Sequence, residues 1–191
     1  GSGGTSTGPT WFYFPGHRIN NITWRAEQGE PIRVTTEAFV KNMVRAPART
    51  GSAYSGSTLN APYMWHDAIN AKIGGTAQNQ IVGWTVTLNN NLERIFNIPT
   101  TAGDRTARRI PEKQAEWSGE LTMNFQDFDE LDAIINGTPE IGSLLELPLS
   151  GSIQLNLYRT KFESTSIPLT PTDLIALRLP FQAQSGSLTT S

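Results

Sequence analysis

Residues 81–125 decide the fold predicted for this chain, and they read IVGWTVTLNNNLERIFNIPTTAGDRTARRIPEKQAEWSGELTMNF. The stretch begins and ends in alternating apolar and polar residues, and a basic loop lies between the two runs. Successive side chains of a strand point to opposite faces of its sheet. In the first run, Trp84, Val86 and Leu88 share one face, while Thr85, Thr87 and Asn89 share the other.

The second run has the same period of two. Its apolar face holds Trp117, Gly119, Leu121, Met123 and Phe125, and its polar face holds Glu116, Ser118, Glu120, Thr122 and Asn124. Each run is therefore predicted to be a strand with one buried and one wet face. The polar face carries carboxylates, hydroxyls and amides but no catalytic set. It indicates a surface along which something passes or stacks, and not a reaction pocket.

Further strands are predicted on both sides of this stretch. Residues Ile19–Ala26 and Ile32–Val40 form a hairpin around a Gly-Glu-Pro turn, and Tyr63–Ile73 holds two short strands. Two more are predicted at Ser152–Arg159 and Leu174–Ala183, after a connection rich in Gly and Pro. Pro180 places the last strand at a sheet edge or ends it early, because proline has no N–H to donate.

One segment, Asp127–Asn136, has helical spacing. Acidic residues occupy its first turn and Gly137 follows its end, as is typical of helix boundaries. The predicted fold class is therefore mainly β, an antiparallel β-sandwich or rolled barrel with one flanking α-helix. We expect one domain over residues 11–185, with a flexible leader at 1–10, extended loops at 45–62 and 99–113, and a polar tail at 186–191.

Composition narrows the classes of function. The 191 residues carry a net charge of −2, so the chain as a whole is not a nucleic-acid clamp. It has no cysteine, which excludes disulfides and thiolate zinc sites. No apolar run approaches the roughly 20 residues of a membrane helix. Gly1 stands where an initiator Met would, and no signal-peptide pattern follows, so we expect the chain to begin within a longer product or after processing.

Candidate reactive residues have simpler interpretations. His66-Asp67 lies near no nucleophile motif, and neither His66 nor His17 has zinc-ligand spacing, so both histidines are predicted to be ordinary loop or strand residues. The acids of Asp127–Asp132 do not follow calcium-loop spacing. The tryptophans Trp24, Trp84 and Trp117 lie on apolar strand faces and are predicted to be core, whereas an exposed Trp11 or Trp65 would favour sugar binding.

The order of the motifs carries a resemblance. The strand leading into Leu92-Glu93-Arg94, the basic loop RRIPEK, the strand with SGELT and the DFDELDAI segment together resemble bacteriophage tail tube proteins. The segments APYMWHDA and EQGEPIRVTTEA are similar to that family as well, so the resemblance spans about residues 19–183.

The resemblance implies a non-enzymatic structural subunit with no cofactor. Six copies would close into a ring around a channel, and the rings would stack into a tube through which DNA leaves the virion. It implies a place in the virion tail after assembly in the host cytoplasm, with no membrane insertion. The implied partners are further copies of the chain, tape measure and tail terminator or tip proteins, and double-stranded DNA passing without tight binding.

Two sets of residues are candidates for these roles. A polar or acidic channel wall would not hold DNA, since lysine and arginine create affinity for phosphate; the candidates for this wall are Thr85, Thr87, Glu116, Ser118 and Glu120. Candidates for contacts between subunits or rings are Arg94, Arg105, Arg108, Arg109, Asp127 and Asp129. The alternatives are another virion β-sandwich, such as a capsid decoration or tail adaptor protein, and a carbohydrate-binding module.

Overall fold

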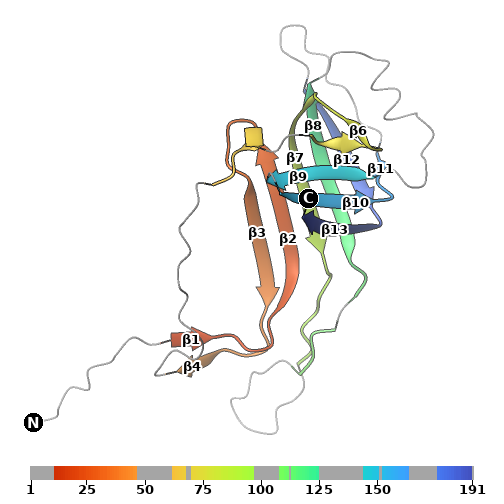
Figure 1. The fold of residues 1–191 in the computed structure, drawn as a ribbon. Helices are drawn as coiled ribbons and strands as arrows, with labels where there is room; N and C mark the ends of the chain where they lie inside the picture. Colours follow the sequence, from red (N-terminus) through yellow and green to blue (C-terminus); the bar gives the residue numbers. More distant parts are fainter. Residues whose placement is uncertain are drawn as a thin grey trace, which may run out of the picture.

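The structure is a computed structural model that describes residues 11–46, 62–67, 70–96, 108–111, 113–124, 144–150, 152–163 and 176–190. These residues form two large antiparallel sheets and a separate two-stranded one (Figure 1). In spatial order, the six-stranded sheet consists of β11 (Lys161–Phe162), β12 (Ala176–Ala183), β8 (Glu116–Asn124), β7 (Ile81–Asn89), β2 (Arg18–Glu27) and β3 (Arg33–Phe39).

The second large sheet has five shorter strands. In spatial order these are β13 (Ser185–Thr190), β10 (Ile153–Tyr158), β9 (Leu145–Ser150), β5 (Lys72–Ile73) and β6 (Thr76–Ala77). Strands β9, β10 and β13 run across the long strands of the six-stranded sheet (Figure 1). The two sheets therefore form a sandwich with crossed strands, and the predicted β-sandwich is confirmed.

The core lies between the two sheets. The six-stranded sheet contributes the alternating apolar residues expected from its sequence, among them Trp24, Trp84, Val86, Leu121 and Met123, all buried. Four fully buried leucines of β9 and β10 face them from the other sheet: Leu145, Leu147, Leu155 and Leu157. Burying one such side chain contributes about 1.5–3 kcal/mol, so this apolar interface is the main source of stability.

The chain passes from one sheet to the other at a shared corner. Strand β12 continues into β13 through Gln184 alone, and β10 leads to β11 through Arg159, whose φ is 54°. The Gln184 N–H donates to the Tyr158 carbonyl at 3.1 Å, and Arg159 Nη1 donates to Gln184 Oε1 at 2.9 Å. These bonds join the two crossings, so the sheets close on this side as in a rolled barrel.

Pro180 lies where its missing N–H is harmless. Its carbonyl accepts a hydrogen bond from Glu163 N at 2.9 Å, on the side of β12 that faces the short β11. The N–H and C=O of a strand residue point to the same side, so the ring faces the sheet edge and leaves the β8–β12 pairing intact. The predicted edge position and early end of the strand are both wrong, because β11 lies outside β12 and β12 continues to Ala183.

Four expectations about elements need correction or fall outside the described residues. The connection before residue 152 contains β9, and the predicted polar tail forms most of β13, which pairs with β10 over six residues. Within Tyr63–Ile73, the described residues form a 3₁₀ turn at Trp65–Asp67 and the strand β5, in place of two strands. The predicted helix Asp127–Asn136 lies outside the described residues, among which no α-helix occurs.

Gly119 allows the large sheet to pack closely. In the sheet register it lies between Val86 and Phe181, and a Cβ built on it would overlap the Thr85 carbonyl oxygen and the Phe181 ring. The Phe181 ring fills the space that a side chain at position 119 would take, and Phe181 is 1% exposed. The alternating sequence pattern predicts which face Gly119 lies on, but it does not show that only glycine fits there.

Replacing Gly119 by Ala is expected to lower the free energy of unfolding by roughly 1–3 kcal/mol, because both backbone and ring must shift. The matched control is Gly83→Ala on the adjacent strand, where the nearest atom to a new Cβ is Ala26 O at 3.1 Å. Denaturant midpoints measure both. Equal losses for the two variants would contradict the packing role assigned to Gly119.

Candidate functional site

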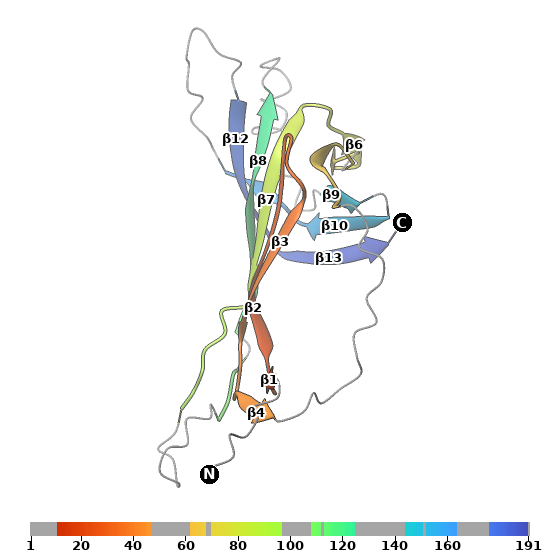
Figure 2. The same ribbon diagram turned by 90° about the vertical axis from the view of Figure 1, so that its left-hand side faces the viewer.

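The first candidate surface is the polar face of the six-stranded sheet, defined as the side chains of β2, β7, β8 and β12 that point away from the core. The five-stranded sheet lies on only one side of the six-stranded sheet (Figure 2). All five predicted wall residues lie on the polar face, because the β7–β8 register pairs Thr85 with Glu120, Thr87 with Ser118 and Asn89 with Glu116.

Charges on the polar face are nearly balanced. It carries three carboxylates (Glu27, Glu116 and Glu120) against two guanidinium groups (Arg25 and Arg178), an excess of one negative charge. Arg25 forms an ion pair with Glu27, and Arg178 lies 3.8 Å from Glu120. The hydrogen bond from Arg25 lowers the pKa of Glu27, which keeps that carboxylate ionised at neutral pH. The predicted wall residues include the carboxylates of β8 but neither arginine, because Arg25 and Arg178 come from other strands.

The second candidate surface is the basal arm, which consists of β1 (Trp11–Tyr13), β4 (Val44–Ala46) and segments 14–17, 40–43, 90–96, 108–111 and 113–115. It extends beyond the sandwich, next to the ends of β2 and β3 (Figure 2). Strands β1 and β4 pair over three residues each.

Asparagines hold the arm to the sheet. Asn90 Nδ2 donates to the Ile19 carbonyl at 2.9 Å, and Asn91 Nδ2 donates to the Gln114 carbonyl at 3.1 Å. The Leu92 N–H donates to Asn20 Oδ1 at 2.9 Å. Asn91 has a φ of 48°, a left-handed conformation that asparagine tolerates better than most residues. The Asn-rich turn noted in the sequence therefore satisfies backbone groups where regular pairing stops.

The predicted contact residues are only partly described. Arg94 lies in the arm with its Cζ 5.1 Å from the Phe39 ring centroid and 5.7 Å from that of Phe96, so its guanidinium already stacks on aromatic rings within the chain. Arg108 and Arg109 are exposed, and backbone bonds between Ile95 and Arg108–Arg109 hold them. Arg105, Asp127 and Asp129 lie outside the described residues.

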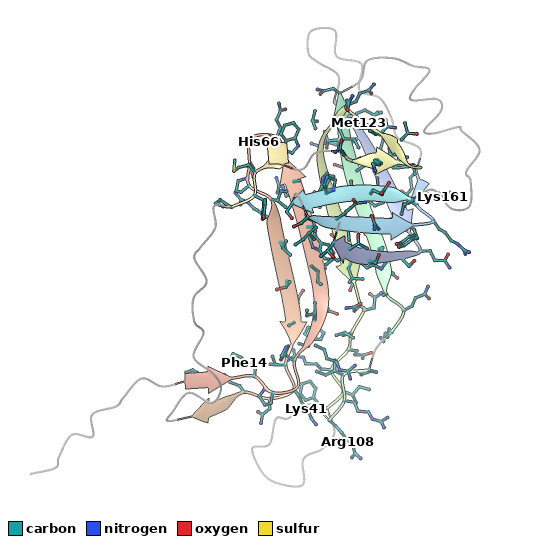
Figure 3. All side chains as sticks on the ribbon, viewed as in Figure 1. Phe14, Lys41, His66, Arg108, Met123 and Lys161 are labelled. Carbon is teal, nitrogen blue, oxygen red and sulfur yellow. The ribbon has the colours of Figure 1, made fainter. Side chains whose placement is uncertain are left out.

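A cavity of about 510 Å³ opens in the arm. We call it the basic cavity, because four of its seven lining residues are cationic; the lining consists of Gly16, Arg18, Lys41, Arg108, Arg109, Ile110 and Pro111. Lys41 and Arg108 lie together at this end of the molecule (Figure 3). Arg18 and Lys41 were not among the predicted contact residues, because pairings between distant segments bring the four cations together: β2–β3 pairing sets Arg18 opposite Phe39, and a separate bridge joins Ile95 to Arg109.

Of the candidate reactive residues, the two histidines lie within the described part of the chain, and the acids of Asp127–Asp132 lie outside it. His17 and His66 are both exposed. No cluster of three or more metal-ligating side chains occurs within the described ranges. The ring centroids of Trp24 and Trp117 lie 5.9 Å apart in a stacked arrangement. The core assignment is confirmed for Trp24 and Trp84, whereas Trp117 is partly buried and packs against the core. Trp65 is also partly buried and packs against the core, and it offers no exposed platform.

The comparison with known families agrees with these surfaces. A family model described as phage tail tube protein matches residues 1–183, and the chain belongs to that family. No curated protein matches the sequence. In the part of the chain that the structure describes, no helix has the length and apolar character to cross a membrane. The protein is thus a component of the phage tail, and its family is a structural one.

The ion pair between Glu93 and Lys113 allows a test of whether the arm has this structure in solution. Lys113 Nζ lies 2.8 Å from Glu93 Oε2, and this hydrogen bond lowers the pKa of Glu93. Any stabilisation from the pair is therefore present at neutral pH and lost as the pH falls through the lowered pKa. Lys113→Met is expected to return the Glu93 pKa toward its ordinary value, as followed by carboxyl NMR titration.

The control for this titration is Lys161→Met, which removes an exposed lysine from β11 at a distance from the arm (Figure 3). It should leave the Glu93 titration unchanged. A Glu93 pKa that does not respond to Lys113→Met would show that the ion pair is absent in solution.

Proposed function

We propose that this protein is the subunit of the tail tube itself, in which six copies form a ring and stacked rings form a channel for DNA ejection. The observation that carries the proposal is the family match over residues 1–183, combined with a long sheet that has one buried and one polar face. The match favours this function over a decoration protein, a tail adaptor or a carbohydrate-binding module.

The edges of the six-stranded sheet support closure into a ring. Strand β3 pairs only with β2 among the described strands, and its residues from Arg33 to Ala38 are exposed. An exposed edge offers unsatisfied backbone groups to another chain and is an aggregation hazard unless it is covered. Head-to-tail contacts, in which the β3 edge of each copy meets a different surface of the next copy around a closed ring, cover all of these edges.

In this proposal, the polar face of the six-stranded sheet lines the channel. DNA binding strength depends on lysine and arginine placed against phosphates. The polar face offers hydroxyls at Thr85, Thr87 and Ser118, and carboxylates balance its two arginines. Such a wall lets DNA pass without holding it.

The remaining assignments follow from the same proposal. Arg94, Arg105, Arg108 and Arg109 contribute to contacts between subunits or rings, as do Asp127 and Asp129. Further partners are tape measure and tail terminator or tip proteins, and assembly takes place in the host cytoplasm.

Electron microscopy of the purified, concentrated protein tests the proposal directly. Rings or tubes with a central hole are expected. If the protein remains monomeric even when purified tail tips are added as nuclei, the proposed function is wrong.

A lysine on the polar face should hinder DNA passage. Glu120→Lys exchanges a negative for a positive charge six times per ring, so ejection from virions that carry the variant should slow by about tenfold at low salt and less at high salt. The control is Glu146→Lys on the outer face of the five-stranded sheet, which makes the same charge change. Equal ejection rates for both variants would refute the assignment of the channel wall.

The arginines of the 99–113 loop should matter for assembly but not for folding. Replacing Arg105, Arg108 and Arg109 together by Ala is expected to change the free energy of unfolding by no more than about 0.5 kcal/mol, the usual range for surface substitutions. Tube yield by sedimentation should fall, because charged contacts at an interface set register and specificity. Unchanged tube yield and length would exclude these arginines from the assembly contacts.

A further inference from the structure

The basal arm carries a group of exposed apolar side chains. Phe12, Phe14 and Met43 are 52%, 47% and 57% exposed. Residues two apart in an extended chain share a face, so Phe12 and Phe14 lie on one side of the arm. Tyr13 pairs with Val44, and Phe14 and Met43 come next on the two chains. We call Phe12, Phe14 and Met43 the arm patch. Apolar side chains that gather on a surface commonly mark a protein–protein contact.

A second cavity, of about 490 Å³, has a different character from the basic cavity. We call it the tryptophan cavity, because Trp65 and Trp84 form part of its wall. Ala71 and Ile81 add apolar surface, and the other lining residues are His66 and three residues with side-chain amides. None of the eight lining residues, all within the described part of the chain, is an aspartate, glutamate, lysine or arginine. Apolar walls with a few polar groups are typical of cavities that receive a largely apolar ligand.

Hydrogen bonding and strand pairing fix the tryptophan cavity at one end of β2. The Trp65 N–H donates to the Glu30 carbonyl at 3.0 Å, just beyond the end of β2, and Trp84 lies opposite Ala26 in the β2–β7 register. The arm patch lies beyond the other end of this strand, which begins at Arg18. The cavity and the patch therefore lie at the two ends of one strand.

The length of β2 keeps the two surfaces apart within one copy. Arg18 and Ala26 are separated by eight steps of about 3.3 Å each, or about 26 Å. Phe14 precedes Arg18 by four residues and lies at most about 14 Å from it. Phe14 and His66 accordingly lie toward opposite ends of the molecule (Figure 3). A contact between the arm patch and the tryptophan cavity must therefore join two copies.

We propose that the arm patch of one copy inserts into the tryptophan cavity of the next copy along the tube. This inference rests on the proposed tube function and names the apolar contact that stacks one ring on the next. Neither surface contains a lysine, arginine or carboxylate, so their contact removes apolar area from water without burying one of these charges. Aromatic rings also gain from edge-to-face or offset contact with one another. Because the two surfaces differ and lie at opposite ends, the contact is head-to-tail and gives the stack a direction.

Removal of the apolar rings from the arm should stop stacking and leave ring closure intact, because the proposed ring contact uses a sheet edge. Phe12→Ser/Phe14→Ser is expected to form single rings in electron micrographs and to lose at least about tenfold in tube yield by sedimentation. The matched control, Ile153→Ser/Leu188→Ser, removes two exposed apolar side chains from the five-stranded sheet and should form tubes normally. Circular dichroism verifies the folding of each variant.

Filling the cavity gives a second, independent test. Asn79→Trp places a large ring at an exposed position of the cavity wall and should also lower tube yield by at least about tenfold. Thr76→Trp adds the same ring at an exposed position of β6 outside the lining and should stack normally. If Asn79→Trp stops stacking while Phe12→Ser/Phe14→Ser does not, the cavity receives another group and the proposed pairing is wrong.

Cross-linking tests the contact itself, and the absence of cysteine from the chain makes it specific. Met43→Cys/Asn79→Cys keeps both phenylalanines and, when treated with a flexible bis-maleimide, should form a ladder of covalent multimers. A mixture of the two single-cysteine variants should stop at dimers, because each copy then carries only one half of the contact. Tyr158→Cys/Asn79→Cys is the control and should form no ladder.

The outcomes separate the two proposals. Tubes that give no ladder, or that form normally from Phe12→Ser/Phe14→Ser, overturn the axial contact and leave the tube function intact. If the unmodified chain forms no rings or tubes, the tube function fails. A ladder from Met43→Cys/Asn79→Cys in solution would then still establish binding of the arm patch by the tryptophan cavity, and its absence would overturn both.

Discussion

Burial of one face of the six-stranded sheet against a crossing sheet is the constraint on which the rest of this structure depends. The central parts of β2, β7, β8 and β12 alternate between core-facing apolar residues and outward-facing residues, so burying one face leaves the other face exposed to solvent. Trp24, Trp84 and Leu121 lie on the buried face, and the leucines of β9 and β10 cover them. A slip of one residue in any long strand would exchange the two faces. The register that builds the core therefore also fixes which side chains the polar face presents.

The packing of large rings requires small residues at particular places. The Phe181 ring uses the space above Gly119, and a Cβ on Gly186 of β13 would lie 2.9 Å from the Trp117 ring. Trp117 in turn stacks on Trp24 across the intervening β7. Two glycines thus let aromatic side chains fill the space at which the crossed sheets meet. The same corner carries both chain crossings, so strand order and packing reinforce each other there.

The basal arm is stabilised by different interactions from those of the sandwich. Among its described side chains, the buried apolar ones are Leu92 and Ile110. Hydrogen bonds donated by Asn90 and Asn91, one accepted by Asn20 and a cation–aromatic cluster around Arg94 hold the arm in place. Apolar side chains such as Phe14, Met43 and Phe96 remain exposed there, alongside the basic cavity. A segment built mainly from polar bonds and exposed rings suits a surface that other copies cover, which agrees with the proposed assembly.

The sequence by itself determined the long strands, their two faces and the core tryptophans, because a period of two is a local property that burial of one face enforces. It also determined the family, through the order of short motifs. It did not reveal β9 or β13, since β9 contains Pro148 and β13 reads as a polar SGSLTT, and each forms because a neighbouring strand pairs with it. The basic cavity could not be predicted from the sequence either. Arg18, Lys41 and Arg108 are separated by up to 90 residues, and only strand pairing brings them together, so the tertiary structure alone decided where their charge accumulates.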